Sequence, residues 1–407
     1  MNILYYLQQF PAIGGIETVT ATVANYLSSR GHSITILSHK LKDNAKELLE
    51  LDAGIELLHM PEVENVSPRN TRYLHQVIAD KKIDITIFQD SYAEIEHNLF
   101  ANKKRIVSVE HNSPFYKGLN ALAKYSLIKR ILWHMRHPFW RYRREAFEGR
   151  RRRFLYDHSA AYVLLSNRFF GEFRAVTKLF DTRKLRAIPN PISDKICTRP
   201  KEKENIVLFC GSLNSLKGCD YLISAWKLFF ESCNDWRLVI VGDGPERVKL
   251  EAQAAELKNV FFEGYKSDPS DYFARAKIFA FPSRREGWGL VLVEAMANGC
   301  VPIAFDSYSA VHDIITNEEN GYVVPAFDIE AYAKRLVDLA NDDTKRESIS
   351  AQARKSAERF SIAKIGPMWE SLLSEVSRNG GGAIICEHSA PYAYIKGNLQ
   401  QKSKRCL

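Results

Sequence analysis

The stretch FPSRREGWGLVLVEAMANGCVPIAF, residues 281–305, decides how the chain is interpreted, because it holds a glutamate in an unexpected place. Residues 290–297 are apolar on every side apart from Glu294, which favours a helix that is packed on all faces. Burial of an unpaired carboxylate is costly, so Glu294 requires a reason. Glu286 stands eight residues earlier, on the loop that leads into the same helix. If this helix starts near Gly289, Glu294 lies about 7 Å along its axis.

Two interpretations of this pair of glutamates are open. In the structural one, Glu286 caps the helix N-terminus and Glu294 pairs with a neighbouring Lys or Arg. In the functional one, a sugar phosphate lies over the free N–H groups of the first helical turn, and the two carboxylates accept hydrogen bonds from sugar hydroxyls. Either glutamate alone favours the structural interpretation, whereas the two glutamates together, eight residues apart around the helix start, favour a sugar site.

Outward from this stretch, short apolar runs alternate with helical stretches along most of the chain. The predicted strands are NILYYL, SITILS, IDITIFQD, RIVSVEHN and AAYVLLSN in the first half, then IVLFCG, WRLVIVGDG, NVFFEG, IFAFPS and CVPIAF. Residues 188–205 between the two sets have three prolines and no periodicity, which is typical of a linker. The pattern predicts an α/β protein with two doubly wound, Rossmann-like domains, residues 1–195 and 196–364, that face each other across a cleft.

Length and composition agree with an ordinary globular protein of two domains. The 407 residues are 45% hydrophobic and 26% charged, and no apolar stretch is long enough to span a bilayer. The N-terminus has no basic leader, so we expect a cytoplasmic location. The seven cysteines form no CxxC pair, which favours reduced thiols and argues against disulfides or a metal site.

Glycine-containing loops follow several predicted strands, where a parallel sheet binds its ligands. GSLNSLKG, residues 211–218, combines glycines, the start of a helix and Lys217, a combination that suits a phosphate but is often only structural. VGDGPER, residues 241–247, is a turn of the same kind. Neither GxxxxGK[ST] nor GxGxxG occurs at these turns, which argues against a P-loop ATPase and a dinucleotide-dependent oxidoreductase.

The net charge of +9 is concentrated in one segment. Residues 124–153 hold eleven basic and two acidic residues, and the rest of the chain is close to neutral. The segment is either a core-packed helix pair with a solvated basic side or a contact with an anionic membrane surface. Nucleic acid is disfavoured as a partner, because no recognised nucleic-acid-binding fold accompanies the charge.

Several motifs together resemble the retaining glycosyltransferases of family 4, which have the two-domain GT-B fold. They are GGIE (14–17), IPNP (188–191), VGDGPER, VFFEGY (260–265), PSRREGWGLVLVEAMANGCVPIA (282–304) and NGYVVP (320–325). The likeness extends to about residue 378. It implies metal-independent transfer of a sugar, without a cofactor, from a nucleotide-diphosphate sugar to a glycan or lipid-linked acceptor. Such transfers belong to the synthesis of cell-surface polysaccharides or glycolipids. If the basic segment 124–153 contacts an anionic membrane surface, the enzyme would be peripheral on the inner face of the membrane.

The resemblance also implies roles for individual residues. Glu286 lies beside the transferred sugar with His111 near it, and Glu294 holds the ribose. The implied donor-binding residues are Gly14, Gly15, Gly211, Lys217, Tyr265, Gly287, Leu290, Val291 and Glu294. A C-terminal helix, residues 365–378, is expected to pack back on the N-terminal domain, and residues 379–407 have no periodicity that can be interpreted.

One departure from the family pattern concerns the diphosphate. Ser212 stands where the family usually has an arginine, and we expect Arg284 or Arg285 to compensate. Ser212 leaves open a catalytically altered homologue that binds the sugar nucleotide without turnover. An epimerase with the same fold is a further alternative, but it does not account for Glu286 and Glu294 as placed.

Overall fold

The computed structural model describes residues 1–10, 14–40, 49–62, 67–89, 105–114, 138–193 and 202–378, without the side chains of Lys40 and residues 138–145. Most of the basic segment 124–153 and all of the tail 379–407 therefore lie outside the described residues or side chains. Among the described residues, no helix is both long and apolar enough to cross a membrane.

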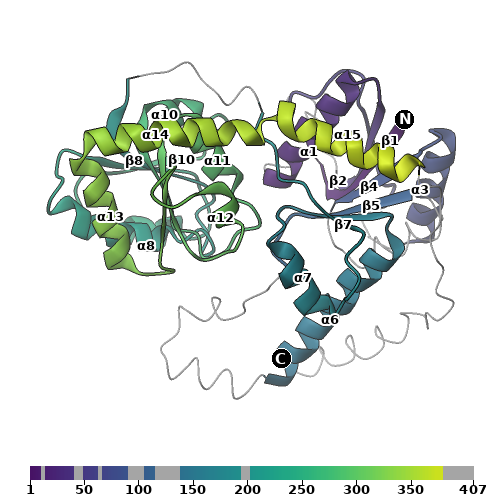
Figure 1. Cartoon of the computed structure of the whole chain (residues 1–407), viewed down its shortest axis with the longest axis horizontal. Coiled ribbons are helices and arrows are strands. Elements are labelled where there is room, and N and C mark those ends of the chain that lie inside the picture. Colours follow the sequence, from purple (N-terminus) through teal and green to yellow (C-terminus); the bar gives the residue numbers. More distant parts are fainter. Residues whose placement is uncertain are drawn as a thin grey trace.

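Two fully parallel sheets form the centres of two α/β domains (Figure 1), as the sequence predicts. The N-terminal sheet has the order β3 (Glu56–His59), β2 (Ser33–Lys40), β1 (Asn2–Gln9), β4 (Ile85–Gln89), β5 (Arg105–Glu110), β6 (Ala161–Leu164), β7 (Leu185–Ala187). The C-terminal sheet has the order β10 (Val260–Gly264), β9 (Arg237–Val241), β8 (Glu204–Cys210), β11 (Ala276–Phe281), β12 (Val301–Phe305), β13 (Tyr322–Val324). The sequence patterns missed β3, β7 and β13, which are sheet-edge strands of four residues or fewer and lack a long apolar run.

Helices cover both faces of the N-terminal sheet. Alternate residues of β1 separate the two layers, because successive side chains of a strand point to opposite faces. Ile3 and Tyr5 face a core with α1 (Gly15–Ser29) and α15 (Ile362–Arg378). Leu4 and Tyr6 face the opposite core with α3 (Pro68–Asp80), α6 (Pro138–His158) and α7 (Phe169–Thr177).

The C-terminal sheet is layered in the same way. One face packs on α8 (Cys219–Phe230), α9 (Arg247–Ala254) and α13 (Ile329–Asn341). The other face packs on α10 (Ser270–Arg275), α11 (Leu290–Ala297), α12 (Val311–Ile314) and α14 (Asp343–Ala357). The apolar core on this second face continues into the core beneath α6 and α7 of the N-terminal domain, so the two domains share buried surface.

The chain returns to the N-terminal domain at its C-terminal end. From α14 it passes through a short 3-10 helix, Glu358–Phe360, into α15, which lies beside α1 (Figure 1). Trp369 and Leu373 of α15 are buried in the core beneath α1, and Glu370 accepts a hydrogen bond from Tyr26 Oη at 2.8 Å. The contact is close at Gly366, where an added Cβ would lie 2.5 Å from the Tyr26 ring.

We expect Gly366→Ala to lower the free energy of unfolding by about 1–3 kcal/mol, because the methyl group has to displace a packed aromatic ring. Gly171→Ala in α7 is the matched control, since nothing lies within 4 Å of the Cβ it would add. The control should be neutral or slightly stabilising, because alanine is the better helix former. Urea unfolding of both variants measures the difference, and equal effects would show that α15 is not closely packed on α1.

Candidate active site

The loop between β11 and α11 carries the first glutamate to the helix N-terminus. The helix begins at Leu290 with Gly289 as its N-cap, close to the predicted start. Gly289 has φ +96°, and a Cβ there would lie 2.8 Å from Tyr308 Oη, so both the backbone conformation and the space require glycine. No described residue accepts a hydrogen bond from the N–H groups of Leu290 or Val291, which leaves them open to an anion.

Glu286 is the glutamate with a cationic partner. Lys217 Nζ lies 2.6 Å from Glu286 Oε1, and Ser283 Oγ donates to the same oxygen at 2.8 Å. The carboxylate side chain is 11% exposed, so the ion pair is largely shielded from solvent. Ser307 Oγ donates to the carbonyl oxygen of Ser283 at 2.6 Å and fixes this loop from the next strand end. Lys217 and Glu286, which are 69 residues apart in sequence, thus form one unit.

Glu294 has no such partner. Its carboxylate makes no hydrogen bond or ion pair with any residue that the structure describes, and burial raises its pKa from 4.5 to about 7. The thiol of Cys210 lies close by, and its pKa is raised to about 12 by burial and by the charge of Glu294. The structural interpretation, in which Glu294 pairs with a Lys or Arg, is therefore wrong within the described residues.

His111 lies in the N-terminal domain, directly after β5, against the glutamate loop. The strand end is fixed by Glu110, which accepts hydrogen bonds from Arg152 at 2.7 and 2.8 Å and from Tyr162 Oη at 2.9 Å. Both ring nitrogens of His111 are buried, and no described residue forms a hydrogen bond with either of them. Burial lowers the pKa of His111 to about 4, an effect that the side chain of Asn190 opposes. The imidazole is therefore neutral near pH 7.

The two domains meet at this point. A Cβ added to Gly287 would lie 1.8 Å from the carbonyl oxygen of His111, so only glycine allows this approach of the two backbones. Glu172 of α7 accepts hydrogen bonds from Ser113 Oγ at 2.5 Å and from Ser309 Oγ at 2.6 Å, one serine from each domain. Thus the loop that carries Glu286 meets the backbone of His111, and polar contacts hold both loops in place, whereas the roles of the two side chains toward a donor stay predictions.

The remaining predicted residues are less closely linked to Glu286. Gly211 follows β8, and its N–H donates to Val241 O at 3.0 Å, which holds this turn against the end of β9. Gly14 and Gly15 are exposed at the N-terminus of α1, and Tyr265 is half-exposed after β10. No described hydrogen bond joins any of these four residues to Glu286. Their roles toward the donor stay predictions.

Arg284, one of the two arginines expected to compensate for Ser212, is paired with Asp220. Its guanidinium donates to both carboxylate oxygens of Asp220, at 2.7 and 2.6 Å, and to the carbonyl oxygen of Ser215 at 2.7 Å. It also lies over the ring of Tyr221, 4.1 Å from the centroid. The charge of Arg284 is thus paired with Asp220 in the free protein, and the expectation that Arg284 or Arg285 compensates for Ser212 stays a prediction.

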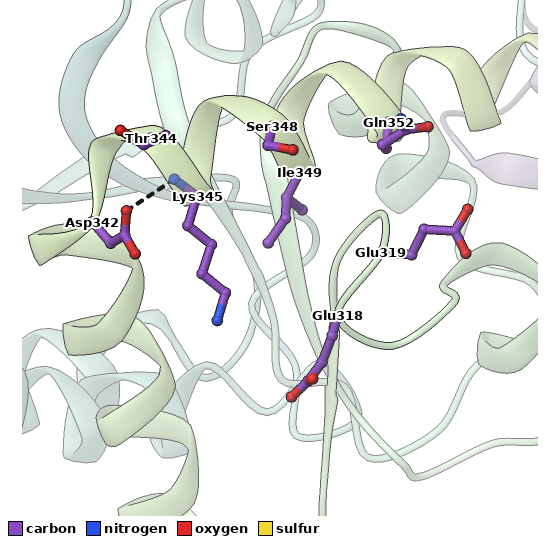
Figure 2. A pocket seen from close by; sticks show the side chains of 8 residues that line it. All are labelled: Glu318, Glu319, Asp342, Thr344, Lys345, Ser348, Ile349 and Gln352. Carbon is purple, nitrogen blue, oxygen red and sulfur yellow. Dashed lines mark hydrogen bonds between the residues drawn. The ribbon is translucent and has the colours of Figure 1, made fainter.

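A separate hollow of about 620 Å³ lies in the C-terminal domain between α14 and the loop of Glu318 and Glu319 (Figure 2). Asp342 caps α14 there by accepting a hydrogen bond from Lys345 N at 2.9 Å. Its lining includes none of the residues around Glu286, so it is distinct from the candidate site.

Family models match both domains. Glycosyltransferase Family 4 matches residues 13–195, and Glycosyl transferases group 1 matches residues 194–356. The chain belongs to the family 4, group 1 glycosyltransferases.

Individual relatives agree with this assignment. An uncharacterized glycosyltransferase of Haemophilus influenzae is 26% identical over 394 residues, 91% of this chain and 99% of the relative. GalNAc-alpha-(1->4)-GalNAc-alpha-(1->3)-diNAcBac-PP-undecaprenol alpha-1,4-N-acetyl-D-galactosaminyltransferase of Campylobacter jejuni is 29% identical over 199 residues, 48% of this chain and 55% of the relative. The crystal structure of Anabaena HepE in complex with UDP matches with a TM-score of 0.73 at 18% identity, over 92% of this chain and 100% of that one. This glycosyltransferase thus has the GT-B fold.

Sequence reasoning missed several residues that shape the active site of this glycosyltransferase. Ser283, Ser307 and Ser309 position its loops, and Glu172 joins the two domains. Tyr308 places its hydroxyl at the N-cap of α11. The position of the 306–310 loop directly after a predicted strand was the only available signal, because loops at the carboxyl ends of parallel strands form the ligand sites.

We predict that Glu294→Gln stabilises the free protein at pH 8 by roughly 1–3 kcal/mol. A carboxyl group whose pKa is raised in the folded state favours the protonated protein, so stability is lost as the pH rises from 4.5 through about 7. Glutamine has no charge to bury, so the gain should vanish near pH 4. Urea unfolding at pH 4 and pH 8 measures it. Glu286→Gln is the control and should not stabilise at pH 8, because it loses the pair with Lys217; a loss of stability in Glu294→Gln at pH 8 would contradict the unpaired carboxylate.

Proposed function

We propose that this glycosyltransferase transfers a sugar from a nucleotide-diphosphate sugar with retention of anomeric configuration and without a metal ion. The observation that carries the proposal is the half-buried carboxylate of Glu294, which has no partner among the described residues and lies eight residues after Glu286 of the Lys217–Glu286 pair. An ionised carboxylate in this position needs hydrogen-bond donors, and sugar hydroxyls supply them.

The donor would extend from Glu294, at its nucleoside end, to Glu286, at its sugar end. Its ribose hydroxyls would donate to Glu294, and its diphosphate would lie between Lys217 and the open N–H groups of Leu290 and Val291. The transferred sugar would then lie beside Glu286. Positive charge at the diphosphate stabilises the leaving group as it departs, which is the main demand of this reaction.

In the proposed transfer, a hydroxyl oxygen of the acceptor bonds to the anomeric carbon while the bond from that carbon to the phosphate oxygen breaks. The acceptor approaches on the face from which the diphosphate leaves, and the departing phosphate oxygen takes the hydroxyl proton. No side chain has to act as a general base. His111, which is neutral at pH 7, would position the donor sugar through a hydrogen bond.

The acceptor would be a glycan or a lipid-linked sugar of cell-surface polysaccharide or glycolipid synthesis. The name of the Campylobacter jejuni relative describes an α-linked sugar added to an undecaprenyl-diphosphate carrier, which supports this class of acceptor. A lipid-linked acceptor would require contact with a membrane. Among the described residues, Phe180 is 91% exposed in the loop after α7, two residues after the exposed Lys178. Arg183 in the same loop is paired with Asp181 at 2.8 Å. An exposed phenylalanine beside a lysine suits an anionic lipid surface.

Turnover is tested by incubating the protein with UDP-, GDP- and ADP-sugars and measuring the release of the nucleoside diphosphate. The proposal expects slow hydrolysis of at least one donor and faster release once a hydroxyl acceptor is added. Tight donor binding without any release would instead support the catalytically altered homologue that Ser212 leaves open.

Substitution of each glutamate should have a different kinetic effect. Glu294→Gln should raise the donor KM more than it lowers kcat, because the ribose does not change during transfer. Glu286→Gln should chiefly lower kcat, because it faces the sugar whose bond breaks. Steady-state kinetics measures both variants, with binding of the product nucleotide as the control. A reversed pattern would exchange the two assigned roles.

The membrane contact is tested with vesicles. Phe180→Ala should reduce co-sedimentation with anionic phosphatidylglycerol vesicles, whereas neutral phosphatidylcholine vesicles should bind neither protein. Phe261→Ala is the matched control, since Phe261 is also exposed (44%) but lies on β10 of the C-terminal domain. An equal loss in both variants, or none in either, would exclude Phe180 as a membrane contact.

A further inference from the structure

Tyr308 has a buried hydroxyl that the protein leaves unused. The residue lies in the loop after β12 and is 7% exposed, and its Oη atom has no hydrogen-bond partner among the described residues. Burial of an unpaired hydroxyl costs free energy, so a tyrosine kept in this state calls for a partner that arrives later. A phenylalanine would fill the same space without this cost.

The Tyr308 ring is held firmly at the start of α11. On one side, Ser307 donates to the carbonyl oxygen of Ser283, and on the other, Ser309 donates to Glu172. The ring packs edge-on against Phe281, with 6.4 Å between centroids, and Oη lies 2.8 Å from the position that a Cβ of Gly289 would occupy. The hydroxyl also lies within the electrostatic field of Glu286, whose charge adds to the effect of burial in raising the pKa of Tyr308. Tyr308 therefore remains a hydrogen-bond donor.

One of the two carboxylate oxygens of Glu286 is available for a further hydrogen bond. Both hydrogen bonds from Lys217 and Ser283 go to Oε1, and no described residue donates to Oε2. A bound diphosphate would compete with Glu286 for Lys217, because it carries the larger negative charge. Once Lys217 turns toward the diphosphate, Glu286 would be a shielded carboxylate held by Ser283 alone.

We propose that Tyr308 is the positioning residue that then holds Glu286: as Lys217 moves to the diphosphate, the Tyr308 hydroxyl donates its hydrogen bond to Glu286 Oε2. Lys217 and Tyr308 alternate as partners of one carboxylate, so Glu286 keeps its orientation beside the transferred sugar. The part played by the diphosphate rests on the proposed function, whereas the relation between Lys217, Glu286 and Tyr308 does not.

The first experiment needs no substrate. Tyr308→Phe is made in the natural sequence and in Lys217→Ala, and urea unfolding midpoints are compared at pH 8. In the natural sequence the variant should be neutral or slightly stabilising, because it removes an unpaired hydroxyl. In Lys217→Ala it should be destabilising, because Glu286 there already depends on Tyr308. Tyr5→Phe is the matched control: Tyr5 is fully buried in β1 with an equally unpartnered hydroxyl, so its effect should be the same in both backgrounds.

Two outcomes would overturn the proposal. Equal destabilisation by Tyr308→Phe in both backgrounds would show that the hydroxyl is already bonded in the free protein. A neutral effect in both would show that it does not reach Glu286.

The second experiment uses calorimetry to measure the affinity for UDP, GDP or ADP, whichever the natural protein binds most tightly. Tyr308→Phe should weaken binding of this nucleotide roughly tenfold, since release of Lys217 from Glu286 is no longer offset by a new hydrogen bond. Tyr5→Phe should bind the same nucleotide with unchanged affinity. Unchanged affinity in Tyr308→Phe would contradict the exchange of partners. If the natural protein binds none of UDP, GDP and ADP, the proposed function fails, and the unfolding comparison still decides the role of Tyr308.

Discussion

The half-buried Glu294 carboxylate, which has no partner among the described residues, is the constraint on which the rest of the site depends. Helix α11 carries this group between Leu292, Val293 and Met296, none of which is exposed to solvent. The packing of these side chains offsets the cost of the carboxylate, which appears as a pKa raised to about 7. We therefore expect the protein to be less stable above pH 7 than it would be with a neutral residue there. Trade-offs of this kind between stability and activity are typical of ligand sites.

The other side chains of the site are held by contacts that cross between the domains. The approach of Gly287 to the His111 carbonyl brings the glutamate loop against the end of β5, and Glu110 with Arg152 fixes that strand end. Glu172 joins serines of both domains. Each loop is held from a neighbouring strand end. A shift of one domain would therefore change the positions of Glu286 and His111 together. The fixed loops favour a donor site that is largely formed before the donor arrives.

Local patterns in the sequence were enough to predict the architecture and the placement of Glu286 and Glu294 around the start of α11. Periodicity indicated the main strands and helices, and the glycines before α11 indicated its start. The short strands β3, β7 and β13 escaped because edge strands need few apolar residues. The pairing of Lys217 with Glu286 could not be foreseen, since tertiary contacts select among several nearby charges. The same holds for Arg284, whose bidentate contact with Asp220 depends on how two loops meet. Tyr308 carried no motif at all, and only its buried, unpartnered hydroxyl distinguishes it.

We propose that Glu294 is kept unpaired in order to bind the ribose of a nucleotide. The most direct measurement compares the affinity of a nucleoside diphosphate with that of its 2′,3′-dideoxy analogue, in the natural protein and in Glu294→Gln, by calorimetry at pH 8. UDP, GDP or ADP is used, whichever binds most tightly. If Glu294 binds the ribose, the natural protein should bind the dideoxy analogue roughly tenfold or more weakly, and Glu294→Gln should hardly distinguish the two compounds. Equal affinity of the natural protein for both compounds would contradict this proposal.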